Sequence, residues 1–281
     1  LRPGSAARSN ASSAVCGACC ASRAPPLLVF LPARPEPADD LLILVPRGAR
    51  PTADAIAQVA RNAPWLDHAG PELGGTAGGT IALQRAGLGF DLAGLAPGVP
   101  LPVPLPVPHP LSACELPDDF APASIAAVSL RLGPHIEAGR GNLAILREWF
   151  ALAAALADSL GASGIVWTPA GLALGPALLA RNLQAWTARG ELPVTLLASF
   201  NPTLDGAVQS SGLAFFTGQE FRIEPQLVGG TQQVDTLARL LFRHLVYAGP
   251  QSETGHLSTP DGHPLRIEPA ADGRTIRVWP G

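Results

Sequence analysis

The stretch NLAILREWFALAAALADSLGASGIVWTPAG, residues 142–171, decides the fold because a long apolar helix pattern precedes a strand pattern. Asn142 is a suitable N-cap, and Gly161 stands where a left-handed residue can end the helix. The apolar run from Gly164 to Trp167 stops before Pro169, which predicts a short central strand. The residues that recur at the three- and four-residue steps of one helix face are Leu143, Leu146, Phe150, Ala153, Ala157 and Leu160.

The middle of this predicted helix is apolar on every side, from Trp149 to Ala157. Such a helix is normally covered by several other elements, so we expect it to form the centre of the core. The strand that follows enters a loop at its end. There Trp167 and Thr168 are predicted to contribute to a binding surface.

The composition limits the classes of function. The chain has 281 residues, 47% of them hydrophobic, and a formal charge of -3, which is enough apolar content for a core and gives no basic surface for nucleic acid. No apolar run reaches the roughly 18 residues that cross a bilayer, so we expect a cytoplasmic protein without membrane contact. All 19 basic residues are Arg, which excludes lysine-dependent catalysis and suggests a GC-rich genome.

The composition changes near residue 39. Residues 1–38 are rich in Ala, Ser, Arg and Pro and show no periodicity, which predicts a disordered tail. The same composition also fits an organellar transit peptide. The cysteines of the CGACC motif, residues 16–20, lack a nearby fourth ligand and are interpreted as incidental thiols. Residues 39–281 are predicted to form a single domain.

Further apolar patterns continue the domain. Helices are predicted after Thr52, between Pro176 and Gly190, and after Thr231. Strands are predicted at Leu41 to Val45, Thr80 to Gln84, Ile125 to Leu132, Val194 to Phe200, and Val208 to Phe216 with a continuation toward Ile223. The chain closes with a hairpin around Asp272 and Gly273. The glycines of 74–79 lack the spacing of a dinucleotide-binding motif and are interpreted as a loop.

Every second residue is proline between Pro100 and Pro110. Because successive strand amides point to opposite edges, alternating prolines remove the donors of one edge only. The residues that keep their donors for a neighbouring strand are Leu101, Val103, Leu105 and Val107. An edge strand or packed loop is therefore one interpretation, and a polyproline II recognition arm is the other.

The order of these elements predicts an α+β fold. We expect a two-layer sandwich in which helices pack on one side of a mixed or antiparallel sheet. Two pseudo-equivalent β-α-β halves are an arrangement that would fit the same order.

Several blocks together resemble the bacterial DUF4261 proteins, a family without an assigned function. The likeness covers about residues 40 to 281 and includes Ala126 to Leu132, LPVTLLASF and the terminal DGHPLRIEP. A family motif is matched by Gly212, Leu213, Phe216, Gly218 and Glu220, with Gly218 displaced from the usual spacing. The resemblance implies an α+β domain and supplies no catalytic set.

The densest group of polar residues lies in GPQSETGHLSTPDGHP, residues 249–264. Glu253, His256, Asp261 and His263 are oxygen and imidazole ligands of the kinds that divalent metals bind. Their spacing matches no closed metal motif. The alternative is a polar hairpin loop, in which Asp261 belongs to the turn and Gly262 takes a positive φ.

Other polar residues give weak signals for chemistry. No nucleophile motif occurs, and no serine or cysteine stands beside an arranged base. Glu220 and Glu224 are expected on one face of a strand, about 13 Å apart by strand rise, and are interpreted as a solvated face. Glu220 is nonetheless included in the predicted binding surface.

Two functions follow from these observations. The first is a non-catalytic interaction module, such as a scaffold or an immunity- or secretion-associated protein, with an unidentified protein partner and no cofactor. The second is a metal-assisted hydrolase that uses Glu253, His256, Asp261 and His263. The sequence carries no signal for the oligomeric state.

Overall fold

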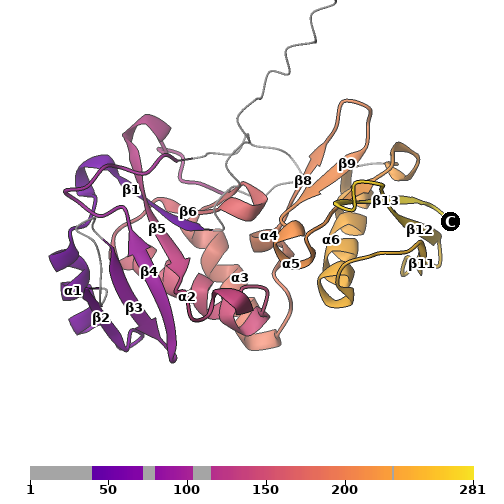
Figure 1. Cartoon of the computed structure of the whole chain (residues 1–281). Helices are drawn as coiled ribbons and strands as arrows, with labels where there is room; N and C mark the ends of the chain where they lie inside the picture. Colours follow the sequence, from indigo (N-terminus) through magenta and orange to yellow (C-terminus); the bar gives the residue numbers. More distant parts are fainter. Residues whose placement is uncertain (1–39, 72–79, 104–114, 230) are drawn as a thin grey trace, which may run out of the picture. The chain divides into compact units, whose positions relative to one another are not determined.

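The computed structural model describes residues 40–71, 80–103, 115–229 and 231–281 (Figure 1). The predicted tail with its cysteines, the glycine-rich loop at 74–79 and most of the proline-rich stretch lie outside these residues. Residues Pro37–Gly281 form one compact unit.

The fold is α+β, as predicted, and contains two sheets among the described residues. The seven-stranded sheet is antiparallel throughout, in the order β2(His68–Pro71), β3(Ile81–Arg85), β4(Leu88–Ala93), β5(Ile125–Leu132), β1(Leu41–Pro46), β6(Gly164–Trp167), β7(Leu172–Leu174). The six-stranded sheet is mixed, in the order β11(Gly255–Ser258), β12(Pro264–Pro269), β13(Thr275–Pro280), β10(Glu220–Ile223), β9(Val208–Ser211), β8(Ser199–Pro202). Its β10 and β13 run parallel.

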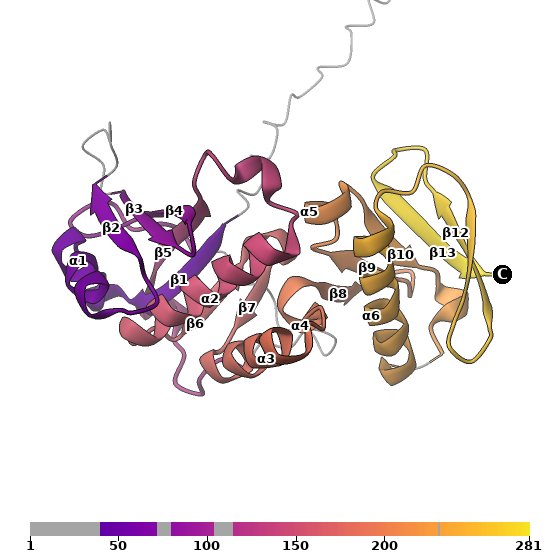
Figure 2. The same ribbon diagram turned by 90° about the horizontal axis from the view of Figure 1, so that it is seen from below.

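Capping residues stand at the ends of several described helices. The six α-helices of the described chain are α1(Ala53–Asn62), α2(Leu143–Ser159), α3(Pro176–Arg189), α4(Val194–Leu197), α5(Ala214–Thr217) and α6(Thr231–Ala248). Thr52 and Asn142 accept hydrogen bonds from the first turns of α1 and α2, and Gly190 ends α3 in the left-handed conformation. Figure 2 shows α2 and α3 side by side.

The central strands of the seven-stranded sheet are buried on both faces. Along β1, Leu41, Ile43 and Val45 belong to the main core with α2, whereas Leu42 and Leu44 face a second apolar cluster. That second cluster is covered by Leu101, Val103, Leu116 and Phe120. The continuous apolar sequence LLILV follows from this arrangement, because a strand with two covered faces has no polar side.

The predicted central helix is confirmed as the centre of this core. Trp149 and Phe150 of α2 are fully buried, and their rings lie 5.5 and 5.2 Å from the ring of Trp167. The indole Nε1 of Trp149 donates a hydrogen bond to the carbonyl of Leu130 in β5. The all-round apolar sequence of α2 therefore serves packing.

The six-stranded sheet is covered by α6 on one face only. The inward side chains Ile223, Ile276 and Val278 are fully buried in the main core, as are Ala238 and Phe242 of α6. Arg222, Arg277 and Trp279 alternate with these residues along β10 and β13 and point to the opposite face. This alternation is typical of a sheet with one solvated face.

Two strand predictions were wrong in the same region. Val194 to Leu197 form the helical turn α4, and the strand begins only at Ser199. The run from Val208 to Ile223 is divided into β9, α5 and β10 by Gly212 and Gly218, whose φ angles are +108° and +75°. Positive φ suits glycine and interrupts a strand. Strands β2, β4, β7 and β11 were not predicted.

Only the beginning of the proline-rich stretch is described. There Leu101 forms an isolated antiparallel bridge with Ala127 of β5. This pairing agrees with the prediction that Leu101 keeps its backbone groups for a neighbouring strand. Residues 104–114 lie outside the described chain, so the choice between an edge strand and a recognition arm stays a prediction.

Candidate functional site: a groove beside helix α6

Two adjoining cavities lie between α6 and the β11–β12 hairpin, with volumes of about 980 and 250 Å³. They share the lining residues Leu237, Leu240, Thr259, Pro260 and Leu265, so they form one continuous surface. We call this surface the α6 groove. The segment after β10 closes one end with Gln226, Leu227 and Gly229.

The floor and walls of the α6 groove are mainly leucine. Its leucines are Leu227, Leu237, Leu240, Leu241, Leu257 and Leu265. Leu241 and Leu265 are buried, but Leu237, Leu240 and Leu257 are only half-buried. Apolar surface that stays in water is unfavourable, and a concentrated patch of it typically marks a binding site.

One side of α6 extends this surface along the helix. Gln233, Leu237, Leu240, His244 and Tyr247 follow one another at steps of three and four residues, the spacing of a single helix face. The first four line the groove. Tyr247, the single tyrosine of the sequence, is 64% exposed and lies on the same side one turn further on.

The rim of the groove is polar, and the β11–β12 turn supplies much of it. The amide of Thr259 donates to the carbonyl of His263, and the amide of Gly262 donates to the carbonyl of Thr259. Gly262 has a φ of +84°, as the hairpin interpretation predicted. This turn places Asp261 and His263 at the groove, where Asp261 is the one charged carboxylate among the described lining residues.

The structure brings only two of the four predicted metal ligands together. Asp261 and His263 line the α6 groove, whereas His256 precedes Leu257 in β11 and therefore points to the opposite face of the sheet. Glu253 is exposed before β11 begins and does not line the groove. Among the described residues, no three His, Cys, Asp or Glu side chains are grouped so that they could hold a metal.

The prediction that Trp167 contributes to a binding surface was wrong, and the hydroxyl of the partly exposed Thr168 is engaged within the fold. Trp167 is fully buried, and its Nε1 donates to the carbonyl of Leu197. The Thr168 hydroxyl accepts from the amide of Asp40 and donates to its carbonyl, at 2.8 and 2.9 Å. These residues are occupied by packing and by fixing the start of β1, because β6 is an interior strand of its sheet.

Glu220, the third residue of that predicted surface, holds α5 in place. Its carboxylate accepts hydrogen bonds from the Ser210 hydroxyl and from the amides of Gly212, Leu213 and Ala214. Burial raises the pKa of the Glu220 carboxyl, while these hydrogen bonds act to lower it. Because four donors surround it, the carboxylate of Glu220 has an internal, structural role.

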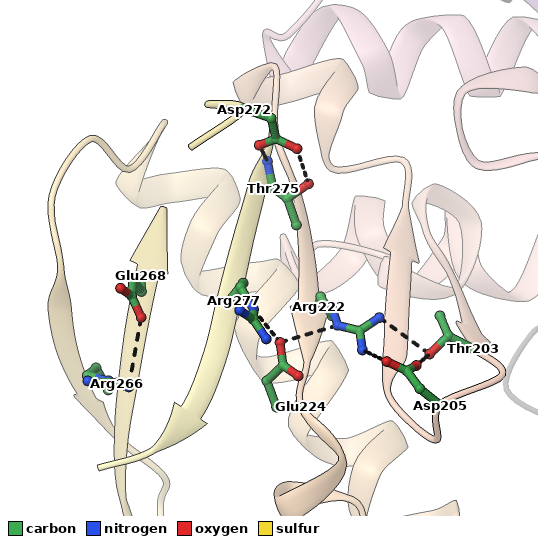
Figure 3. A network of polar contacts seen from close by, with 9 residues as sticks. All are labelled: Thr203, Asp205, Arg222, Glu224, Arg266, Glu268, Asp272, Thr275 and Arg277. Atoms are coloured by element: carbon green, nitrogen blue, oxygen red, sulfur yellow. Dashed lines mark hydrogen bonds and ion pairs between the residues drawn. The ribbon is translucent and has the colours of Figure 1, made fainter. Parts of the chain in front are cut away.

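Glu224 is buried, contrary to the prediction that its carboxylate is solvated. It is 3% exposed, and one carboxylate oxygen accepts from Arg222 at 3.2 Å and from Arg277 at 2.7 Å (Figure 3). Arg222 also pairs with Asp205, which bonds the Thr203 hydroxyl.

The network continues across β13 and β12. The guanidinium of Arg277 lies 4.3 Å from the ring centroid of Trp279, and Arg266 lies 5.9 Å from the same ring. Arg266 pairs with Glu268 at 3.8 Å. Arg222, Arg266 and Arg277 of this face therefore each have a carboxylate partner. The buried Nε1 of Trp279 has no hydrogen-bond partner among the described residues.

The α6 groove could not be found from local sequence patterns, because it combines residues near 227, 237–244 and 257–265. The one local signal was the spacing of Leu237, Leu240 and His244 on α6. That signal places Leu240 and Tyr247 on one side, outside the fully buried stripe of Val234, Leu241 and Leu245.

In the part of the chain that the structure describes, no helix has the length and apolar character needed to cross a membrane. Comparisons with protein-family models, with curated proteins and with solved structures find no match for this chain.

Proposed function

We propose that the chain is a protein-interaction module and that the α6 groove is its binding surface. The observation that carries this proposal is the continuous groove lined by half-buried leucines beside α6. A scaffold or an immunity- or secretion-associated role belongs to the same proposal, as does membership of the DUF4261 family on the sequence blocks quoted above.

The chemistry of the lining favours binding over catalysis. Leucine side chains stabilise a partner by releasing water from apolar surface, and they supply no proton donor, nucleophile or metal ligand. The ionisable side chains at the groove are Asp261, His263 and His244, which belong to different segments and do not form a metal-binding group. An apolar centre with a polar rim is the usual anatomy of a protein interface.

The proposal is tested by selecting displayed random peptides against the purified chain. We expect the wild-type chain to enrich a defined family of peptides rich in apolar residues. Leu240→Asp should abolish this enrichment, because a carboxylate in the groove must lose water when the peptide binds. Circular dichroism and thermal unfolding establish that the variant is folded.

Leu204→Asp is the matched control, since Leu204 is a fully exposed leucine on the β8–β9 turn and does not line the groove. It introduces the same charge at another exposed leucine and should leave the selected peptides bound. Peptides that bind Leu240→Asp as well as wild type, or no enrichment at all, would overturn the assignment of the groove.

A further inference from the structure

Strand β11 leaves one edge of the six-stranded sheet unpaired among the described strands. It is the terminal strand and pairs only with β12. The hydrogen bond from the Thr259 amide to the His263 carbonyl shows that these two residues form a hydrogen-bonded pair. Because such pairs alternate along an antiparallel ladder, Leu257 and Gly255 also exchange hydrogen bonds with β12. The amides and carbonyls of His256 and Ser258 therefore point to the open edge.

Pro264 supports this assignment from the opposite strand. It stands directly across from Ser258 in the register and has no amide hydrogen to give. At the position opposite Ser258, β12 therefore donates no backbone hydrogen bond to β11. Ser258 then has both backbone groups available to another chain.

The open edge runs beside the α6 groove. Leu257 points from β11 toward α6 and lines the groove together with Ser258, Leu240 and His244. A residue that pairs opposite Leu257 in an added strand would place its side chain on the same face of the sheet, against α6. Alternate residues of that strand would meet the leucines, and the residues between them would face solvent.

The charge of the groove indicates one further property of the occupant. Asp261 is the only formally charged side chain in the described lining when histidine is neutral, and no arginine lines either cavity. Asp261 stands at the turn that ends β11, so it lies beyond one end of the open edge. A cationic side chain at that end of the occupant would complement it.

We infer that the α6 groove binds an extended protein segment that adds as a strand to β11, places alternate apolar side chains on α6, and carries a basic residue beside Asp261. This inference rests on the proposed function and states its mode. Strand addition uses backbone hydrogen bonds for affinity and alternate side-chain pockets for specificity, which are the two features that meet at this edge.

The backbone pairing is tested on the tightest peptide from the selection against the wild-type chain. Single N-methyl groups are placed at each residue in turn, and binding is measured by calorimetry. We expect losses of about tenfold or more at alternate residues, where the methyl removes a donor to β11, and small effects between them. A helical peptide, or a loss without alternation, would overturn strand addition.

Ser258→Pro tests the same pairing from the side of the protein. The Ser258 amide points away from β12, so proline there removes a donor at the open edge while the hairpin is kept. We expect peptide affinity to fall about tenfold or more with Ser258→Pro and to stay within about twofold with Ser258→Ala, which keeps the amide. Equal affinity of the two variants at unchanged thermal stability would contradict the inference.

The charge preference is tested by repeating the selection with Asp261→Asn. Wild-type peptides should carry Arg or Lys toward one end, and the variant should lose that preference while it still selects apolar residues. Neutral or acidic ends with the wild type would overturn the charge assignment. If Leu240→Asp abolishes selection and N-methylation shows no alternation, the α6 groove is still the binding surface. In that case only the proposal of strand addition to β11 is rejected.

Discussion

The two sheets of this chain differ in how many of their faces are covered. The seven-stranded sheet has α2 on one face and the cluster of Leu101, Val103, Leu116 and Phe120 on the other. The six-stranded sheet has α6 on one face and a network of arginines, carboxylates and Trp279 on the other. The central strands of the first sheet therefore expose neither face, whereas the second sheet has an outward polar face and the α6 groove.

This difference separates stability from binding within one chain. A sheet buried on both faces commits every side chain of its central strands to packing, so substitutions there act on the free energy of unfolding. A sheet covered by a single helix leaves the flank of that helix exposed. In this chain the exposed flank is the row from Gln233 to Tyr247.

The largest expected effect is in the core of the first sheet. Phe150→Asp would place a carboxylate among Trp167 and the buried residues of α2 and leave a cavity, at a cost of about 3–5 kcal/mol for the lost ring alone. Because small proteins are stable by about 5–15 kcal/mol, we expect an unfolded or aggregated chain by circular dichroism. A folded variant would show that this sheet is not the more completely buried of the two.

The second face of the first sheet gives the next largest effect. Leu44→Ala should lower the free energy of unfolding by about 2–5 kcal/mol, because Leu44 is fully buried in the second apolar cluster. Arg266→Ala is the matched change on the outward face of the six-stranded sheet and should cost less than about 1 kcal/mol. Similar costs in urea unfolding would remove the contrast between the two sheets.

Glu224 tests how far the outward face of the six-stranded sheet depends on its ion network. Glu224→Ala removes the buried acceptor shared by Arg222 and Arg277 and should cost about 1–3 kcal/mol in urea unfolding. Glu268→Ala removes an exposed carboxylate of the same face and should stay within about 0.5 kcal/mol. Equal costs would mean that burial of Glu224 has no energetic consequence.

The smallest expected effect is a pH dependence at Glu220. The pKa of this carboxyl is raised in the folded chain, so its contribution to stability is fully present below the unfolded pKa of about 4.3. That contribution is lost as the pH rises through the folded pKa. The free energy of unfolding of wild type relative to Glu220→Gln should therefore fall as the pH is raised from about 4 to about 7.

Asp272 provides the control of opposite sign. Its pKa is lowered by hydrogen bonds from the amides of Arg274 and Thr275, so its contribution is present above the unfolded pKa of about 3.9 and lost as the pH falls. The difference between wild type and Asp272→Asn should decrease toward low pH. Slopes of the same sign for the two carboxyls would contradict these assignments.

The sequence predicted those elements whose own residues determine their structure. The helix after Asn142, the helix that begins at Pro176 and the hairpin around Asp272 carry caps, periodicity or turn residues within the element itself. The run from Val194 to Phe200 failed because buried apolar residues suit a helical turn and a strand equally well. Its partners in space, which the sequence does not reveal, decided between them.

The candidate site was predicted only in part for the same reason. Asp261 and His263 were singled out by their local density of polar groups, and both line the groove. His256 was included because it stands in the same dense polar segment, but strand alternation turns it to the other face. The spacing on α6 placed Leu240 outside the buried stripe, but it could not show that a groove forms there, since that depends on the position of the neighbouring hairpin.

The parallel pairing of β10 with β13 has a consequence for synthesis on the ribosome. The strands of the first sheet lie between residues 41 and 174, so that sheet can be completed while the rest of the chain is still being made. The second sheet needs β13 between β10 and β12, and β13 ends at Pro280. Because domains fold as their residues emerge, we expect β10 to remain unpaired with β13 until translation passes residue 280.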